Sequence, residues 1–183
     1  VPVVTTVMGR GAIPTNHPLF VGNLGMHGAY AANMAVNECD LLFSIGTRFN
    51  DRITGKLHSF APKAKIVHID IDTSAISRNV QVDIPIVADA KEAVDKMLEY
   101  VEPCQTEDWQ KAISGWKEEH PLTMKKKPVM TPKDILDVIN EMFEEAIVVT
   151  DVGQHQMFTS QFLEMTPKKQ LLMSGGLGTM GYG

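Results

Sequence analysis

Charged and glycine residues follow several apolar runs of this 183-residue sequence. The run LLFSI leads into GTRFNDR (46–52), and the run KIVHIDI (65–71) ends next to Asp70. Ligands of open α/β sheets bind outside the carboxyl ends of the strands, so Arg48 and Arg52 would lie where nucleotide phosphates are held. Asp70 would accept hydrogen bonds from a ribose or an adenine. A solvated loop, with arginines paired to acids, is the alternative.

Two further aspartates admit structural explanations. Asp72 would share a strand face with Asp70, which makes paired carboxylates for acid–base or metal chemistry conceivable. A metal would need more ligands than the nearby sequence offers. Asp89 stands three residues before Glu92, the spacing of a helix capping box, so we expect it to be an N-cap.

Glycine-rich turns occur at both ends of the chain. Gly22-x-x-Gly25-Met-His-Gly28 precedes an alanine-rich segment, where backbone amides and a helix N-terminus would favour an anion. The spacing differs from the dinucleotide fingerprint, so a plain tight turn is equally compatible. Gly153 to His155 form a strand-to-helix turn suited to a diphosphate, although an ordinary connection is the alternative. Five glycines among residues 175–183 imply a close backbone approach to a ligand or a helix.

Short apolar runs and amphipathic segments alternate along the chain. We expect strands at 3–7, 41–46, 65–71 and 82–87 and helices at 28–38 and 91–101. This order is typical of an α/β fold with a doubly wound parallel sheet and flanking helices. After residue 130 we expect a helix capped by Thr131, strands at 146–153 and 171–173, and a helix near 157–165.

The composition divides the chain into three parts. We expect residues 1–102 to form one domain. The polar segment 103–130 is typical of an interdomain linker, with a surface helix that carries Trp109 and Trp116. We expect residues 131–183 to be the start of a second α/β domain that is cut off.

Charge and composition disfavour several classes of protein. The net charge is −5 and the basic residues are scattered, apart from the triplet Lys125 to Lys127, which argues against a nucleic-acid groove. No apolar run is long enough to span a membrane and no leader is evident, so we expect a cytoplasmic chain. Cys39 and Cys104 suit plain structural thiols.

Several motifs occur together in a recognisable order. They are MGRGAIPTNHPLFVGNLGMHG, RFNDR, HIDID, TDVGQHQM and GGLGTMGYG. In order and spacing the chain resembles the catalytic subunits of acetolactate synthases (acetohydroxyacid synthases), thiamine-diphosphate enzymes of branched-chain amino-acid biosynthesis. The resemblance implies an FAD-binding central domain of the FAD/DHS-like type, followed by the beginning of a thiamine-diphosphate-binding domain.

The resemblance also implies particular ligand contacts. The flavin of FAD would contact Met26, His27 and Gly28. Its sugar and phosphate chain would contact Gly46, Arg48, Asn50 and Arg52. Its adenosine end would contact Asp70, Ile71 and Asp89. Thiamine diphosphate would contact Gln154, His155, Gly178 and Met180. Arg52, Met157 and Phe158 would line the substrate and inhibitor channel.

Three positions depart from the family's usual pattern. Asn50 replaces Asp and Ala88 replaces Gly, which would weaken FAD binding slightly. Phe158 replaces Trp, from which we expect a weaker response to herbicide-type inhibitors.

The implied activity joins two pyruvates, or pyruvate and 2-ketobutyrate, with loss of carbon dioxide. It would use thiamine diphosphate, Mg²⁺ and a structural FAD in a homodimer or larger assembly, with a possible regulatory subunit. The activating glutamate and the magnesium motif of the family have no counterpart here, so we expect no catalytic residue, no metal ligand and no synthase activity in these 183 residues alone. The alternatives are a glyoxylate carboligase, a pyruvate oxidase or a non-catalytic nucleotide-binding module.

Overall fold

The computed structural model describes residues 1–126 and 128–183, so Lys127, the last of the lysine triplet, lies outside the described residues. These residues form two compact units, one of Asn33–Glu107 and one of Val1–Ala32 together with Asp108–Gly183. The expected boundaries at residues 102 and 130 stay predictions. Among the described helices, none has the length and apolar character needed to cross a membrane.

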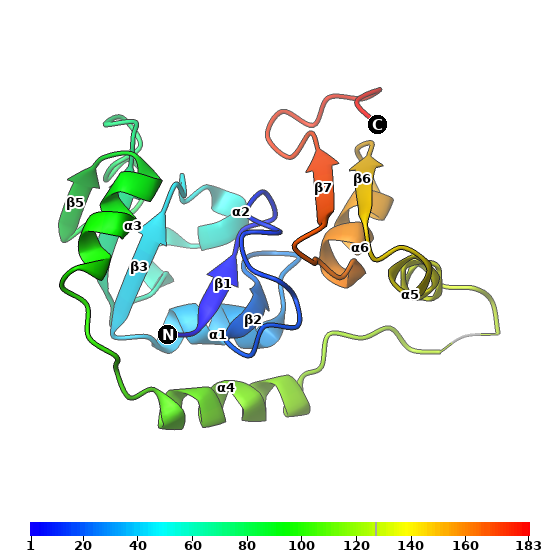
Figure 1. Cartoon of the computed structure of the whole chain (residues 1–183), viewed down its shortest axis with the longest axis horizontal. Coiled ribbons are helices and arrows are strands. Elements are labelled where there is room, and N and C mark those ends of the chain that lie inside the picture. Colours follow the sequence, from blue (N-terminus) through cyan, green and yellow to red (C-terminus); the bar gives the residue numbers. More distant parts are fainter. Residues whose placement is uncertain (127) are drawn as a thin grey trace. The chain divides into compact units, whose positions relative to one another are not determined.

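The unit Asn33–Glu107 contains a three-stranded parallel sheet (Figure 1). Its strands, in sheet order, are β3 (Leu41–Ile45), β4 (Lys65–Asp70) and β5 (Ile84–Val87). Helix α3 (Ala90–Leu98) contacts β4, and the short helices α2 (Asp51–Thr54) and η1 (Leu57–Ser59) lie between β3 and β4 in the chain. Pro85 is tolerated in β5 because an edge strand leaves one side of its backbone unpaired.

The other unit contains two pairs of parallel strands. They are β1 (Val3–Thr5) with β2 (Phe20–Asn23), and β6 (Ala146–Thr150) with β7 (Lys169–Met173). Its helices are α4 (Glu107–Glu119, from Asp108 onward), α5 (Pro132–Met142) and α6 (Gln154–Phe162). Helix α1 (Tyr30–Glu38) begins in this unit and continues into the first one. The expected α/β architecture with parallel strands is confirmed.

Each unit has its own apolar core. Phe49, Ile66, Val80 and Val82 are buried together in the first unit. In the second, α5 and α6 pack around Leu136, Leu163 and Met165, with Val148 and Leu171 of the strands against them. These cores fix the carboxyl ends of the strands, where the candidate ligand residues lie.

Two predicted helix starts are confirmed. Thr131 forms a capping box with Asp134: the Asp134 amide donates to Thr131 Oγ1 (3.3 Å), and the Thr131 amide donates to Asp134 Oδ2 (2.7 Å). Asp89 Oδ1 accepts hydrogen bonds from the amides of Lys91 (2.8 Å) and Glu92 (3.2 Å) at the start of α3.

Several elements differ from the expectations. Strand β2 was not expected, and α2 begins at Asp51, inside the segment read as a loop. Helix α6 begins at Gln154, earlier than the expected start near 157. Strand β4 ends at Asp70, so Asp72 lies in the following turn and the expected alternation of the two carboxylates along one strand does not hold.

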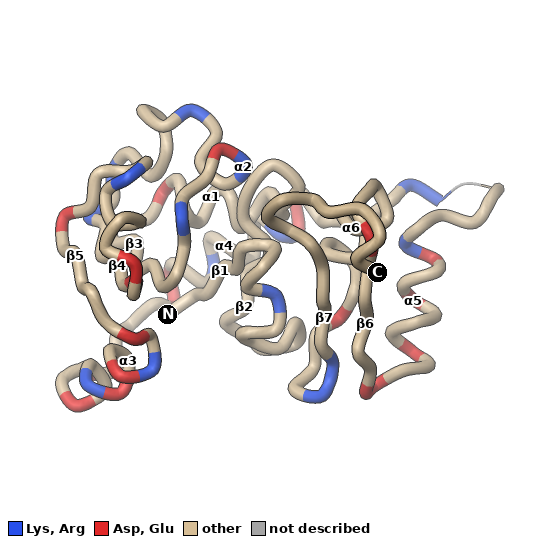
Figure 2. Tube along the Cα trace, turned by 90° about the horizontal axis from the view of Figure 1, so that it is seen from above, with Lys and Arg blue, Asp and Glu red and all other residues tan. Residues whose placement is uncertain are grey.

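Basic and acidic residues are interspersed along the backbone (Figure 2). Helix α3, for example, carries Lys91, Glu92, Asp95 and Lys96, and Lys91 forms an ion pair with Asp95 at 2.5 Å. Side chains of both signs thus share one helix.

Candidate functional site

A sharply turned loop follows β3. Gly46 has φ +63° and donates its amide to the carbonyl of Ile69 (2.8 Å), which ties the start of the loop to β4. Phe49 has φ +47°, a conformation that costs a non-glycine residue energy, yet its side chain is only 4% exposed. Burial of Phe49 in the core offsets this cost and leaves its neighbours Arg48 and Asn50 exposed.

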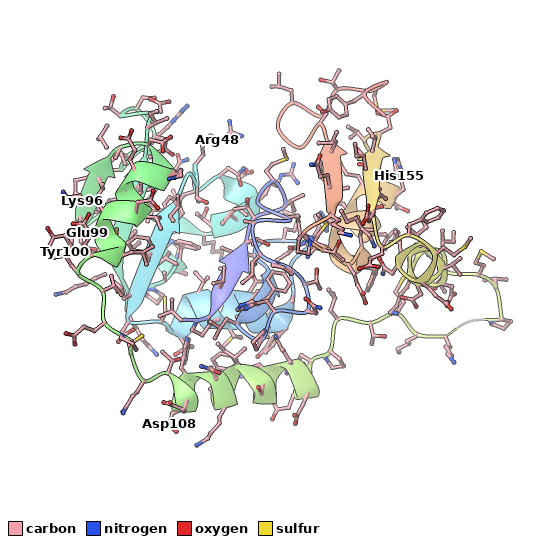
Figure 3. All side chains as sticks on the ribbon, viewed as in Figure 1. Arg48, Lys96, Glu99, Tyr100, Asp108 and His155 are labelled. Carbon is pink, nitrogen blue, oxygen red and sulfur yellow. The ribbon has the colours of Figure 1, made fainter. Side chains whose placement is uncertain are left out.

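The two arginines of this loop have different surroundings. The Arg48 carbonyl accepts a hydrogen bond from Asn79 Nδ2 (3.0 Å), and the side chain extends beyond the end of β3 (Figure 3). Asn50 is the N-cap of α2, because its Oδ1 accepts the amide of Ile53 (3.2 Å). Arg52 is an exposed residue of this short helix.

Strand β4 ends in the second candidate group. Asp70 Oδ1 accepts the amide of Asp72 (2.9 Å), and its Oδ2 lies 3.7 Å from Nε2 of the buried His68. The next residue, Ile71, is 74% exposed, which offers an apolar surface beside a carboxylate.

The parallel register brings these groups to one edge of the sheet. Ile45 pairs with Ile69, and Asp70 pairs with Val87, so the three strands end side by side. The predicted FAD residues at or directly after the strand ends therefore share one edge: Gly46, Arg48, Asp70, Ile71 and Asp89. Asn50 and Arg52 lie further along the chain, at the start of α2. Cations for phosphates, carboxylates for hydroxyl or amino groups and an apolar side chain form a donor set that fits a nucleotide.

The remaining predicted flavin residues belong to the other unit, in the turn before α1. The Gly28 amide donates to the carbonyl of Gly25 (2.9 Å), and a Cβ at Gly28 would lie 2.2 Å from the Asn23 carbonyl oxygen. Only glycine fits at position 28. Met26 and His27 are exposed on this turn.

The second predicted ligand turn follows β6. Gly153 precedes α6, and Gln154 and His155 are exposed in its first turn, as Figure 3 shows for His155. Nearby, Thr150 Oγ1 and Gln156 Nε2 are buried and have no hydrogen-bond partner within the described part of the chain. Exposed donors, a helix N-terminus and unsatisfied polar atoms form a set that fits a diphosphate group.

Asp151 connects this turn to the glycine-rich segment. Its carboxylate accepts the amides of Val152 (2.9 Å) and Gly181 (3.0 and 3.1 Å). These bonds, together with other backbone donors and the charge of His155, hold the pKa of Asp151 below its usual range. Gly178 has φ +66° and its Cβ position is 3.8 Å from Val152, so the segment 174–183 lies over the β6–α6 turn. Met180 is exposed in this segment.

The predicted channel residues have different surroundings. Phe158 packs against the core of Leu136, Leu163 and Met165, and Met157 is half-buried. Arg52 belongs to the other unit. Their role in a substrate channel stays a prediction.

Sequence reasoning gave no role to some residues that the structure makes prominent. Asp151 belongs to the motif TDVGQHQM, and the structure shows that it anchors the glycine-rich segment. The burial of Phe49 and His68 could not be predicted from a single sequence, because it depends on how β4 packs.

Helix α6 also contacts the N-terminal segment of its unit. Asn23 Nδ2 donates to the Ser160 carbonyl (2.6 Å), and Gln161 Nε2 donates to the His27 carbonyl (2.9 Å). Arg10 donates to the Leu163 carbonyl, and burial lowers the pKa of its guanidinium to about 10. The glycine turn before α1 and the turn at the start of α6 are thus joined through one helix.

Comparison with protein families decides the assignment. Residues 1–97 match the central domain of thiamine pyrophosphate enzymes, and residues 151–183 match their C-terminal, thiamine-pyrophosphate-binding domain. The chain belongs to the thiamine pyrophosphate enzymes. This family fits the two clusters, one at the ends of β3–β5 and one at the ends of β6 and β7.

Individual thiamine pyrophosphate enzymes are similar over the whole chain. A probable acetolactate synthase large subunit of Methanocaldococcus jannaschii is 44% identical over 198 residues, covering 100% of this chain and 33% of the relative. The acetolactate synthase large subunit of Parasynechococcus marenigrum is 44% identical over 188 residues, and that of Porphyra purpurea is 43% identical over 190 residues. Both alignments include 100% of this chain; they span 30% of the Parasynechococcus marenigrum protein and 32% of the Porphyra purpurea protein. It thus spans about a third of the length of the relatives it matches.

Proposed function

We propose that the protein containing this chain is the catalytic subunit of an acetolactate synthase. It would join two pyruvates, or pyruvate and 2-ketobutyrate, with loss of carbon dioxide. The observation that carries the proposal is the similarity to acetolactate synthase large subunits across the entire chain, at 44% identity. The two strand-end clusters lie within the segments that this similarity covers.

Thiamine diphosphate, when bound, supplies the electron sink for breaking the carbon–carbon bond of a 2-keto acid. In the proposal, Gln154, His155 and the N-terminus of α6 hold its diphosphate. Gly178 and Met180 would contact its pyrimidine ring, through backbone and side chain respectively. Asp151 keeps the glycine-rich segment in place by accepting the Gly181 amide.

FAD is proposed as a structural ligand of the central domain. The arginine loop would bind its phosphates, the ends of β4 and β5 its adenosine, and the turn of Met26, His27 and Gly28 its flavin. Support comes from the donor set at the β3–β5 edge, where Arg48 follows β3 and Asp70 ends the adjacent strand β4. The proposal also includes Mg²⁺ bound outside these residues, a cytoplasmic location, a homodimer or larger assembly, and a possible regulatory subunit.

Arg52, Met157 and Phe158 are proposed to line the substrate channel, which inhibitors would share. Because Phe is smaller than the Trp usual in the family, sulfonylurea-type inhibitors would bind more weakly. Inhibition of the full-length protein at nanomolar concentration would contradict this part of the proposal.

The activity is tested on the protein encoded by the complete reading frame that contains these residues. With thiamine diphosphate, Mg²⁺ and FAD, pyruvate should yield acetolactate. Parallel reactions with glyoxylate, and a measurement of oxygen consumption with pyruvate, detect a glyoxylate carboligase or a pyruvate oxidase. Either of those products without acetolactate would replace the proposal, and a flavin-binding protein with no turnover would favour a non-catalytic module.

Flavin binding has its own test. Arg48→Gln should lower the FAD retained by the full-length protein after desalting, whereas Lys63→Gln, which changes an exposed cation paired with Glu38, should not. Equal retention by both variants would remove Arg48 from the proposed site. The chain of 183 residues alone is proposed to make no acetolactate, and its formation by the purified chain would contradict this.

A further inference from the structure

His68 is a buried polar side chain that the proposed function leaves unused. It lies in β4 and is 0% exposed, and neither ring nitrogen makes a hydrogen bond of good geometry with any described residue, although the Thr47 backbone is close enough to raise its pKa slightly. Buried polar groups in proteins are usually paired, so an unpaired imidazole at this depth calls for an explanation.

The neighbour of His68 on the same side of the strand is Asp70. The 3.7 Å between His68 Nε2 and Asp70 Oδ2 exceeds a hydrogen bond by a few tenths of an ångström, while Oδ1 is already fixed by the Asp72 amide. One carboxylate oxygen is therefore anchored, and the other faces the imidazole. A small rotation of the carboxylate would bring Oδ2 within reach of an Nε2–H donor.

The charge of the ring follows from its surroundings. Burial lowers the pKa of His68, against the weaker opposing effects of the Asp70 carboxylate and the Thr47 backbone. A neutral imidazole carries one N–H and can still donate to a carboxylate.

Phe49 connects this pair to the arginine loop. Its ring meets the imidazole edge to face, with centroids 5.1 Å apart and planes at 74°, and meets Phe60 at 5.8 Å. Phe49 stands next to Arg48 and holds the φ of +47° that shapes the loop. The contact between Phe49 and His68 thus joins the arginine loop to the end of β4.

We propose that His68 is a positioning residue for the adenosine end of the nucleotide site: when the Asp70 carboxylate rotates to bind the ligand, its Oδ2, now 3.7 Å from Nε2, accepts the imidazole N–H, and His68, packed against Phe49, fixes that carboxylate relative to the arginine loop. The inference rests on the proposed FAD site. It adds a residue that never touches the ligand but determines how strongly the site prefers ligands that contain adenosine.

The test compares ligands in the full-length protein after removal of flavin. FAD and ADP contain the adenosine diphosphate group, whereas FMN lacks adenosine. His68→Phe removes the donor and keeps an aromatic ring against Phe49, so FAD and ADP should bind about tenfold more weakly, as for one lost hydrogen bond to a charged group. FMN affinity should stay unchanged. His68→Gln retains an N–H donor and should recover most of the ADP affinity.

A double-mutant cycle separates positioning from general destabilisation. In an Asp70→Ala background, His68→Phe should have no further effect on ADP affinity, because the acceptor of its N–H is already absent. Ile69→Val, in the adjacent and fully buried position of β4, serves as the packing control and should leave the ratio of ADP to FMN affinity unchanged.

The outcomes are distinct. If the unaltered protein binds neither FAD nor ADP, the proposed FAD site fails, and the role of His68 fails with it. If it binds both and His68→Phe binds ADP as tightly, or loses ADP and FMN equally, the FAD site stands and the positioning role is overturned. If His68→Phe does not fold, His68→Gln decides: an ADP affinity no better than that of Asp70→Ala overturns the proposal.

Discussion

The carboxylate of Asp151 accepts the backbone amide of Gly181, a residue 30 positions further along the chain, at 3.0 and 3.1 Å. One side chain at the end of β6 thereby fixes the glycine-rich segment that follows β7. Because the carboxylate is ionised when it accepts two amides, these bonds are stronger than neutral ones.

Replacing Asp151 should release the glycine-rich segment. In Asp151→Ala, the amide of Gly181 should exchange its hydrogen about tenfold faster, as expected when one stabilising hydrogen bond is lost. Hydrogen exchange measured by mass spectrometry on peptides from residues 174–183 checks this. Asp137→Ala, which changes an exposed aspartate paired with Lys133 on α5, is the control. Unchanged exchange in Asp151→Ala would show that the segment is held by other contacts.

His68 should make stability depend on pH in the weakly acidic range. Its pKa in the folded chain lies below the ordinary 6.5 because burial disfavours the charged ring. As the pH falls, the unfolded chain therefore binds the proton before the folded chain does. The contribution of the neutral His68 to the free energy of unfolding is complete above pH 6.5 and is lost as the pH falls from there toward the lowered pKa.

The urea midpoint measured between about pH 5 and about pH 8 tests this dependence. The decline at low pH should be smaller in His68→Gln than in the unaltered chain. The exposed His58 provides the control, and His58→Gln should keep the full decline. Identical pH profiles for His68→Gln and the unaltered chain would rule out His68 as the source.

The capping box at the start of α5 should contribute measurably to stability. Thr131→Ala removes the acceptor of the Asp134 amide and should lower the free energy of unfolding by about 1 kcal/mol. Thr131→Ser keeps the hydroxyl and should lose only a fraction of that. Urea denaturation followed by circular dichroism distinguishes the two, and equal losses would mean that the methyl group, not the cap, matters.

Two glycine-to-alanine substitutions should have opposite signs. At Gly28 the added Cβ would meet the Asn23 carbonyl at 2.2 Å, so Gly28→Ala should destabilise the chain by about 3 kcal/mol or more. At Gly115, inside α4, nothing lies within 4 Å of the Cβ position, so Gly115→Ala should stabilise by about 0.5–1 kcal/mol. Thermal unfolding measures both, and a neutral Gly28→Ala would mean that the turn relaxes freely.

The sequence predicted those elements whose residues carry local signals. Thr131 and Asp89 mark helix starts by side-chain chemistry that works within three residues, and both caps are present. Strand β4 was predicted from its apolar run, although it ends at Asp70. Strand β2 was missed because its Gly22 has no strand preference, and its extended form depends on pairing with β1.

The candidate site was predictable to a similar extent. Arg48 and Asp70 were placed at strand ends from order along the chain, and the parallel register brings their strands to one edge. The positive φ of Phe49 and the depth of His68 arise from packing between segments far apart in sequence. Short helices such as α2, with four residues, are below the length at which apolar periodicity can be detected.

Helix α6 has only nine residues, a span of roughly 13 Å. It begins with Gln154 and His155, and near its other end Ser160 and Gln161 hold the turn around His27. A substitution that tilts the helix to suit one predicted cofactor would displace the hydrogen bonds that shape the turn for the other. Selection or engineering acting on either ligand turn is therefore constrained by both, and α6 should tolerate change in its sequence far less than its exposed first turn suggests.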